Sequence, residues 1–503
     1  MAPPRLSPVA AGALAGAAAF AYVFLASGAV ENDHFVVLAR AHQVLYGDWP
    51  VRDFEDPGMP LAYLVPSAAA AIFGPTVFVN VILSLLLFAL TVALVYVLAS
   101  RASGSAVVAV VAAAVTIAVY PRLYNATKVL VPVVAMALGW SYVDTPDRKR
   151  LTWMAAWTAV AFLVRHDYLL YVALSNVTLL AAAHRGDAGA AGRRLMHYAA
   201  LTLLFITPWL VYVQWGEGVA DYVGTAMRFT EIERRRTATG PPPGLLYAFA
   251  AVPAAALVVC WRQGWSAATA KLAPAAVLLL SMDVVFLRDV PAARIPDVIA
   301  PTMLVVAAVA GRTLPRRVMD ACGVAIVLAV LLLVVVPRVR HAGAVPTPSA
   351  LVERAVRVGT RLQRLPADIQ PQPSLAPLAA YLARCTGATD RILVGGFGPE
   401  IPVLAHRPFA AGLPDWIPGY YEDPRDVARA IARLNREEVG AVVMLNGAET
   451  FARSWPDIDR WIHAHGFEGH AVASIDPRVR VWLPRARAAE GADPATGLPC
   501  QPR

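Results

Sequence analysis

Long apolar segments recur through the first two thirds of the chain and restrict its fold more than any other feature. Each is close to the length of a helix that crosses a hydrocarbon core of about 30 Å. Charged residues make up 16% of the 503 residues, against about 25% in an average soluble domain. These features exclude an ordinary soluble enzyme and predict a polytopic α-helical membrane bundle of about eleven spans, near residues 8–30, 76–100, 106–120, 126–141, 152–164, 168–183, 198–215, 243–260, 272–286, 298–311 and 318–337.

The last third of the chain has no apolar run long enough to cross a bilayer. We therefore expect a membrane domain over residues 1–337, with a long first outer loop at 31–75, then a linker over 338–375 and a soluble α/β domain over 376–503. Within the last domain, apolar runs at 391–394, 441–445, 471–475 and 479–483 alternate with helical patterns. Alternation of this kind predicts a βαβ arrangement with a mostly parallel sheet.

Basic residues in the connecting segments suggest an orientation. With the N-terminus inside, the short inner segments carry far more basic than acidic residues, such as the run Arg148, Lys149 and Arg150. The positive-inside rule then favours an inner N-terminus, and an odd number of spans places the C-terminal domain outside. We expect a multi-pass protein of the cytoplasmic (inner) membrane. The net charge of +9 suits anionic lipid surfaces, and it gives no reason to propose nucleic acid as a partner.

Acidic side chains gather in the first outer loop. Glu31 and Asp33 lie where the first span ends, and Asp53, Glu55 and Asp56 follow a Gly-Asp-Trp-Pro turn. One such carboxylate can act as a general base, whereas several can hold a divalent cation. Helix capping is the alternative reading, because the segment 35–46 has helical spacing and Asn32 or Asp33 could cap it.

The motifs of this loop resemble integral-membrane glycosyltransferases of the C-type fold, a group that includes protein O-mannosyltransferases, the aminoarabinose transferase of lipid A and many bacterial relatives. The resemblance rests on DHF at 33–35, LYGDWPVRDF at 45–54, DPGMPL at 56–61 and IFG at 72–74. It implies a C-type glycosyltransferase fold and the transfer of a sugar from a polyprenyl-phosphate donor to a hydroxyl of a glycan, lipid or protein acceptor.

The same resemblance implies roles for the loop acids. Asp33 matches the presumed general base and Glu31 is the second candidate, while Asp53 and Asp56, with Glu55 between them, match a second acidic cluster. Some relatives use a divalent cation, so Mg²⁺ or Mn²⁺ is a candidate cofactor, with ligands that could come from Asp33, His34 and Asp167. His34 stands where many relatives have another acid.

A lipid-phosphate leaving group also needs cations, because Arg and Lys bind phosphate oxygens directly. The candidates all lie near predicted outer ends of spans and are Arg122, Lys128, Arg165, Arg288 and Arg294. The alternative for Arg165 and Arg288 is an ion pair with a neighbouring Asp that only orders the loop. The rival functions are a transporter or flippase and a non-catalytic membrane scaffold.

Four cysteines are present. Cys260 and Cys322 fall in or beside spans, where a free thiol behaves as a small apolar group. Cys385 and Cys500 fall in the predicted outer domain, where disulfides form. We expect these two to pair and to attach the C-terminal tail to the helix before the first strand.

Overall fold

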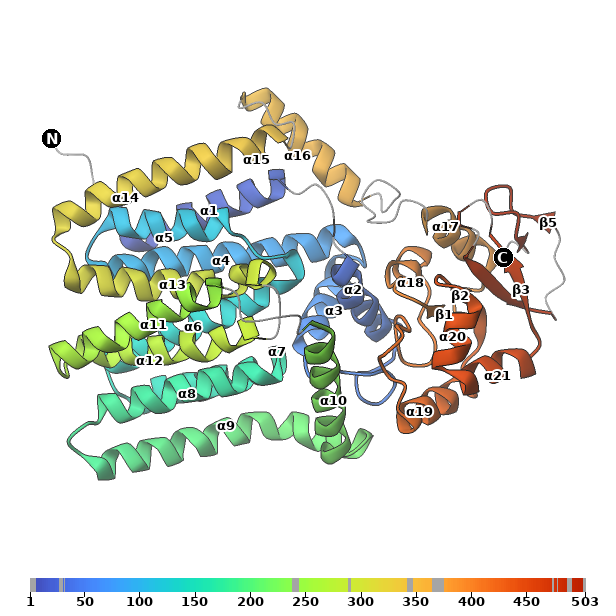
Figure 1. The fold of residues 1–503 in the computed structure, drawn as a ribbon, viewed down its shortest axis with the longest axis horizontal. Coiled ribbons are helices and arrows are strands. Elements are labelled where there is room, and N and C mark those ends of the chain that lie inside the picture. Colours follow the sequence, from blue (N-terminus) through green and yellow to red (C-terminus); the bar gives the residue numbers. More distant parts are fainter. Residues whose placement is uncertain are drawn as a thin grey trace. The chain divides into compact units, whose positions relative to one another are not determined.

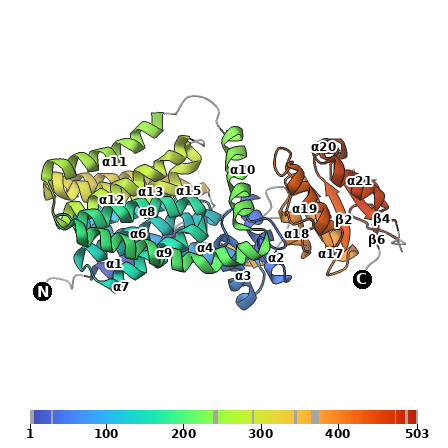
Figure 2. The same ribbon diagram turned by 90° about the horizontal axis from the view of Figure 1, so that it is seen from below.

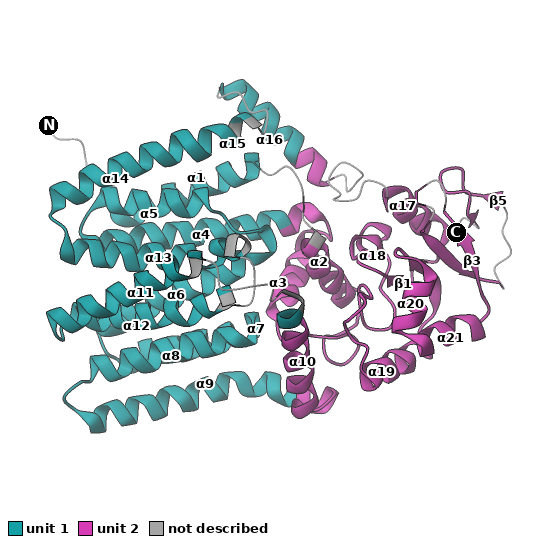
Figure 3. Ribbon diagram, viewed as in Figure 1, with its two compact units in different colours: residues 1–27, 81–212, 233–358 teal, residues 28–80, 213–232, 359–503 magenta. Residues whose placement is uncertain are grey.

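The computed structural model describes residues 6–26, 30, 32–237, 244–287, 291–341, 347–363, 375–472, 475–476, 478–485 and 491–500. They form two compact units that do not follow the linear order of the chain (Figure 3). Unit 1 contains residues 1–27, 81–212 and 233–358, and unit 2 contains residues 28–80, 213–232 and 359–503. Each unit is described by itself below.

Unit 1 is a bundle of long helices (Figures 1 and 2). A helix lies at each of the eleven predicted spans, and within the part of the chain that the structure describes six helical stretches are long and apolar enough to cross a membrane. The helices are α1 (Pro8–Ala26), α4 (Val77–Ser103), α5 (Ala106–Ala118), α6 (Ala126–Asp144), α7 (Arg148–Val164), α8 (His166–Ala183), α9 (Ala188–Gly216), α11 (Gly244–Gln263), α12 (Ala267–Asp283), α13 (Pro291–Thr313) and α14 (Arg316–Val330).

Shorter elements complete this unit. The last span continues from α14 through a π-helical stretch, Leu331–Val335, into α15 (Val336–His341). The 3₁₀ turns η1 (Leu123–Asn125) and η2 (Val284–Leu287) precede α6 and follow α12. The helix α16 (Pro348–Gln363), most of it in unit 1, lies within the expected linker. The last residues of α10 (Val219–Thr237), from 233 on, also belong to this unit.

Small residues allow the helices of unit 1 to pack closely. A Cβ added at Gly16 of α1 would lie 2.6 Å from the Ala89 carbonyl oxygen of α4, and one at Gly311 of α13 would lie 2.6 Å from the Ser103 Cα. Between α7, α8 and α9, the Thr158 and Tyr198 hydroxyls lie 2.7 Å apart, and the Asn176 amide donates to both. Close backbone approach and buried interhelical hydrogen bonds are the contacts that hold helices together in lipid.

Unit 2 joins three segments that are distant in sequence. The first loop contributes α2 (Asn32–Leu45) and α3 (Leu61–Phe73), and most of α10 forms the second segment. The C-terminal segment is an α/β domain with elements α17 (Ala376–Cys385), β1 (Arg391–Gly395), α18 (Glu400–Ala405), α19 (Pro424–Leu434), β2 (Val439–Met444), α20 (Ala448–Ser454), α21 (Pro456–Ala464), β3 (Phe467–Ala471), β4 (Arg480–Pro484), β5 (Gly491–Ala492) and β6 (Pro499–Cys500).

The sheet of this domain is mixed, so the expected mostly parallel sheet is wrong. Its order is β1-β2-β4-β3, with β1 and β2 parallel and β4 antiparallel to both β2 and β3. A helical crossover links β1 to β2 and permits parallel pairing, whereas the short connection between β3 and β4 suits antiparallel neighbours. The strand expected at 471–475 lies earlier, at Phe467–Ala471.

Apolar side chains fill two clusters in this domain. One includes Trp416, Phe451 and Trp455, packed with β2 residues such as Val442. The other includes Tyr381 and Leu382 of α17, packed with residues such as Val394 of β1 and Val443 of β2. Because Val442 and Val443 are neighbours on one strand, their side chains point to opposite faces and the sheet is buried on both sides.

A disulfide joins Cys385 and Cys500, the pair expected to bond, and their Cα atoms are 5.1 Å apart. Cys385 ends α17 and Cys500 ends β6, so the bond attaches the C-terminal tail to the helix that precedes β1. The Tyr381 hydroxyl of the same helix also donates to the Pro499 carbonyl at 2.6 Å. The tail therefore closes against the edge of the second apolar cluster.

Removing this disulfide is expected to destabilise unit 2 by about 2–4 kcal/mol, because a cross-link restricts the unfolded chain and this one joins residues 115 apart. Thermal unfolding of Cys385→Ser/Cys500→Ser and of the wild type, each with and without reductant, measures the effect. Reductant should lower the melting temperature of the wild type only. Equal melting temperatures for the oxidised wild type and the double variant would contradict the prediction.

Candidate functional site

Three of the five predicted phosphate-binding cations lie together at one end of the unit 1 bundle. Lys128 is in the first turn of α6, Arg165 is in the turn between α7 and α8, and Arg294 is in the first turn of α13. Lys128 interacts electrostatically with both Arg165 and Arg294. The fold therefore brings together cations that are distant in the sequence, since Lys128 and Arg294 are 166 residues apart.

Two carboxylates partly balance this cluster. Arg165 donates to the Asp167 Oδ2 at 2.6 Å, and Arg294 lies 3.5 Å from the Asp297 Oδ2. Lys128 interacts electrostatically with both acids. Among the described residues here, three basic side chains lie with two carboxylates, and this excess of basic groups suits an anionic ligand such as a phosphate.

Of the other two predicted cations, Arg122 approaches this cluster through Tyr124, whose ring centroid lies 5.7 Å from the Lys128 Nζ. Arg122 is exposed and donates to the Tyr124 hydroxyl at 2.9 Å. Arg288 lies outside the described residues, and so does the adjacent Asp289. Their roles toward phosphate stay predictions.

The predicted general base, Asp33, is exposed in the first turn of α2 in unit 2. The second candidate, Glu31, lies outside the described residues. Asp33 interacts electrostatically with Asp415 of the C-terminal segment. Arg40 of α2 interacts with the same carboxyl group. The fold thus places Asp33 of the first loop near a buried carboxyl group from a segment almost 400 residues away in the sequence.

Two buried carboxyl groups near α2 were missed in the sequence. Burial raises the pKa of Asp415 to about 7, and the charges of Glu400 and Asp33 add to that effect while Arg40 opposes it. Burial also raises the pKa of Glu400, in the first turn of α18, to about 7. Neither Glu400 oxygen nor the Asp415 Oδ2 has a hydrogen-bond partner within the described parts of the chain. No local motif marks either residue, because the burial of a single carboxyl group depends on long-range packing, such as that of α18, which carries Glu400, against α2.

Each acid of the second acidic cluster, Asp53, Glu55 and Asp56, has a hydrogen-bond or ion-pair partner. Asp53 accepts hydrogen bonds from the Arg52 guanidinium and the Trp49 N–H, each at 2.8 Å. Hydrogen bonds and the positive charge of Arg52 lower the pKa of Asp53, although burial opposes them. Asp56 accepts from the Tyr222 hydroxyl at 2.6 Å and from the N–H groups of Gly58 and Met59 at 2.9 Å.

Glu55 connects the first loop to α19 of the C-terminal segment. Its Oε1 lies 3.6 Å from the Arg429 guanidinium and 3.8 Å from that of Arg433. Arg429 also pairs with Glu217, just before α10, and with Asp426 at 2.6 Å. These contacts hold all three segments of unit 2 together.

The same loop makes two further connections to the C-terminal segment. Arg391 of β1 binds both oxygens of Asp48, at 2.6 and 3.0 Å. The Gln43 side chain donates to the Phe409 carbonyl at 3.1 Å and accepts from the Phe409 N–H at 3.0 Å. Bidentate and reciprocal contacts of this kind fix orientation as well as distance.

The residues considered as metal ligands do not form a three-ligand group in the described structure. Among the residues described, no set of three or more His, Cys, Asp or Glu side chains is arranged to hold a metal ion. His34 is buried, and burial lowers the pKa of its imidazole to about 4. Asp167 pairs with Arg165 in unit 1. We therefore assign no step to a cation held by Asp33, His34 and Asp167.

Comparison with known proteins supports the fold. No protein-family model matches the chain, and no curated protein matches it in sequence. Among solved structures it is similar to ArnT from Cupriavidus metallidurans bound to undecaprenyl phosphate, with 16% identity, a TM-score of 0.55, and coverage of 94% of this chain and 98% of that one. The likeness confirms the predicted C-type glycosyltransferase fold, a helical membrane bundle with a soluble domain.

The buried carboxyl groups predict a pH dependence of stability. Glu400 has a folded-state pKa near 7 and is expected to titrate near its ordinary value when unfolded. Its stabilising contribution is therefore complete at low pH and is lost as pH rises toward 7. The rise from the ordinary value of 4.5 to about 7 corresponds to roughly 3.5 kcal/mol at about 1.4 kcal/mol per pKa unit. Because 1 kcal/mol shifts the melting temperature of such a domain by about 2–4 °C, Glu400→Gln should raise the melting temperature at pH 7.5 by up to roughly 7–14 °C.

Glu449 provides the matched control, because it is an exposed glutamate in the first turn of α20. Glu449→Gln should leave the melting temperature unchanged. Differential scanning fluorimetry at pH 5 and pH 7.5 measures all three proteins. If the wild type and Glu400→Gln lost the same stability between pH 5 and pH 7.5, Glu400 would not be buried in its protonated form.

Proposed function

We propose that this protein transfers a sugar from a polyprenyl-phosphate donor to an acceptor hydroxyl at the outer face of the cytoplasmic membrane. The observation that carries the proposal is the cluster of Lys128, Arg165 and Arg294, three basic side chains that lie with two carboxylates at one end of the bundle. The similar ArnT structure holds undecaprenyl phosphate, which is the kind of lipid that such a cluster would bind.

In the proposed reaction the acceptor hydroxyl oxygen attacks the anomeric carbon of the donor sugar. The bond from that carbon to the phosphate oxygen breaks, and the lipid phosphate leaves with the bonding electron pair. Lys128, Arg165 and Arg294 stabilise the negative charge that develops on the leaving phosphate. Asp33 takes the proton of the attacking hydroxyl, which its exposed position in the first turn of α2 allows.

This proposal gives the loop acids different roles. Asp33 is the one that we assign to chemistry, while Asp53, Glu55 and Asp56 hold the loop in place through the partners described above. The N-terminus is proposed to lie inside and unit 2 to face the outer side, where both the donor head group and the acceptor would be available. The acceptor is a glycan, lipid or protein hydroxyl.

The experiment is transfer from radiolabelled polyprenyl-phosphate sugars by purified protein in lipid nanodiscs. Asp33→Asn should lower kcat by about 100-fold or more, because a general base contributes roughly 10²–10⁴-fold to rate. Lys128→Gln should lower kcat/KM for the donor by about 10-fold or more, because it removes a charge-assisted contact to phosphate.

Two matched variants separate chemistry from general damage. Asp221 is also an acid in the first turn of a helix, and Lys271 forms an ion pair with Asp144 elsewhere in unit 1. Asp221→Asn and Lys271→Gln should keep nearly full activity. Full activity of Asp33→Asn, or no transfer by the wild type from any donor in a panel of hexosyl and pentosyl polyprenyl phosphates, would overturn the proposal.

A further inference from the structure

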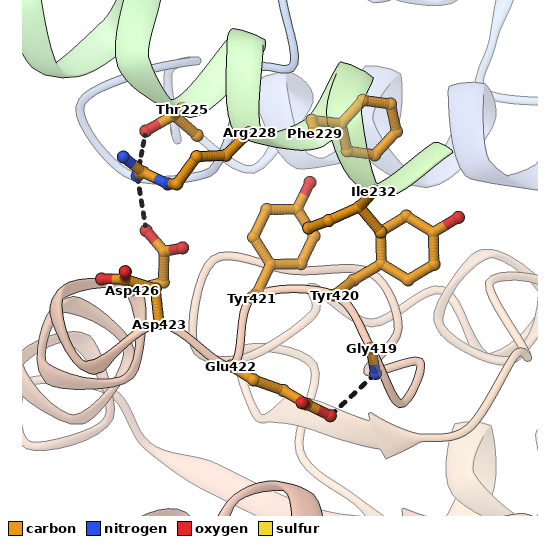
Figure 4. A pocket seen from close by; sticks show the side chains of 10 residues that line it. All are labelled: Thr225, Arg228, Phe229, Ile232, Gly419, Tyr420, Tyr421, Glu422, Asp423 and Asp426. Carbon is orange, nitrogen blue, oxygen red and sulfur yellow. Dashed lines mark hydrogen bonds and ion pairs between the residues drawn. The ribbon is translucent and has the colours of Figure 1, made fainter. Parts of the chain in front are cut away.

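A cavity of about 110 Å³ lies in unit 2, and its lining includes none of the residues assigned to transfer (Figure 4). Its walls come from α10 and from the segment that leads into α19, and both belong to unit 2. The α10 side chains are Thr225, Arg228, Phe229 and Ile232, and the other wall consists of Gly419, Tyr420, Tyr421, Glu422, Asp423 and Asp426.

The cavity has an aromatic side and a charged side (Figure 4). Phe229 lies 5.7 Å from the Tyr420 ring and 6.5 Å from the Tyr421 ring, measured between centroids. Arg228 and Asp426 lie away from these rings and form an ion pair at 3.5 Å. A ligand in this cavity would meet aromatic surface on one side and hydrogen-bonding groups on the other.

Contacts outside the cavity hold its walls in place. Arg429 pairs with Asp426 at 2.6 Å and with Glu217, which joins α19 to the start of α10. The Trp455 indole N–H donates to the Tyr421 carbonyl at 3.2 Å. A preformed wall of this kind lowers the entropy cost of binding.

Tyr421 has an unfavourable backbone conformation. Its φ of +53° is in the left-handed region, which is uncommon for bulky residues and costs of order 1–3 kcal/mol. Gly or Asn would take the same conformation at lower cost. The aromatic side chain therefore stands at a position where the backbone favours a smaller residue, and its ring forms part of the cavity wall.

These features match the chemistry of a sugar ring. The axial hydrogens of a pyranose make an apolar face that packs on aromatic rings, and its hydroxyls donate to carboxylates and accept from Arg. The volume of about 110 Å³ compares with roughly 10–15 Å³ for one water, which suits one sugar ring better than a lipid chain. Three lining carboxylates against one lining Arg disfavour a ligand with negative charge.

We propose that this cavity binds one sugar ring that carries no negative charge. The further assignment, that this ring belongs to the acceptor glycan, rests on the proposed function. The aromatic side chains of Phe229, Tyr420 and Tyr421 stack on the ring, and Arg228 with the neighbouring acids fixes its hydroxyls. The cavity thereby selects neutral or amino sugars over uronic acids.

The test uses full-length protein in nanodiscs and saturation-transfer NMR. The probes are methyl glycosides of glucose, galactose, mannose, arabinose and glucosamine, with methyl glucuronoside as the anionic probe. At least one uncharged or amino glycoside should bind, and the glucuronoside should bind at least about 10-fold more weakly. Tyr421→Asn should weaken binding by about 10-fold, the equivalent of one lost stacking contact.

Trp49→Ala is the matched control, because Trp49 is an exposed aromatic residue of unit 2 that does not line the cavity. It should bind sugar like the wild type. Equal binding by Tyr421→Asn and wild type, equal binding of glucoside and glucuronoside, or no binding of any uncharged or amino glycoside would overturn the inference.

A second arm separates this inference from the proposed function. Asp33→Asn should keep full sugar binding, since Asp33 does not line the cavity. If glycosides bind the cavity but no donor supports transfer, the cavity is a sugar site and the glycosyltransferase proposal is refuted. Transfer with an unchanged acceptor KM in Tyr421→Asn would refute the acceptor assignment and leave the transfer proposal intact.

Discussion

The free-energy cost of placing charge in a low-dielectric environment explains most of what the two units show. Charged side chains are expensive inside a bilayer, so they usually pair or face a polar region. In unit 1, Lys128, Arg165 and Arg294 meet Asp167 and Asp297 at one end of the bundle. Such a concentration of charge is hard to explain by helix packing alone, because small residues and neutral hydrogen bonds already hold the helices together.

The same cost organises unit 2. Glu55 is buried and has two guanidinium groups within 4 Å, and Asp48 is held by both nitrogens of Arg391. Removing one partner of such a buried pair is costly because the other charge stays unpaired. These pairs hold the first loop and α10 against the C-terminal domain, and so they determine where α2 and its Asp33 lie within the unit.

Features that depend on neighbouring residues could be predicted from the sequence, whereas features that depend on contacts between distant residues could not. The spans follow from local hydropathy, and α2 from the helical spacing of residues 35–46, so these were predictable. The direction of β4 was not, because it depends on which strand lies next to it. The partners of Glu55 lie more than 370 residues away, at Arg429 and Arg433. The loop acids therefore looked alike in the sequence, although Asp33 is exposed while Glu55 and Asp56 are buried in polar contacts.

The clustering of Lys128, Arg165 and Arg294 was likewise only partly predictable. Each cation could be placed near the end of a span, but their common location depends on how α6, α7, α8 and α13 pack. Asp415 and Glu400 carried no local signal, since a single carboxylate in a loop or a short helix is ordinary. Only the packed unit shows that both are buried and that one lies near Asp33.

The basic cluster of unit 1 is proposed to bind the phosphate of a polyprenyl lipid. A cryo-electron microscopy structure of the protein in nanodiscs with bound polyprenyl phosphate tests it most directly. We expect phosphate oxygens within about 2.7–3.2 Å of the Lys128 Nζ and of the Arg165 guanidinium, with Arg294 next to them. A phosphate bound elsewhere, with Arg165 still paired to Asp167 and Arg294 to Asp297, would contradict this proposal.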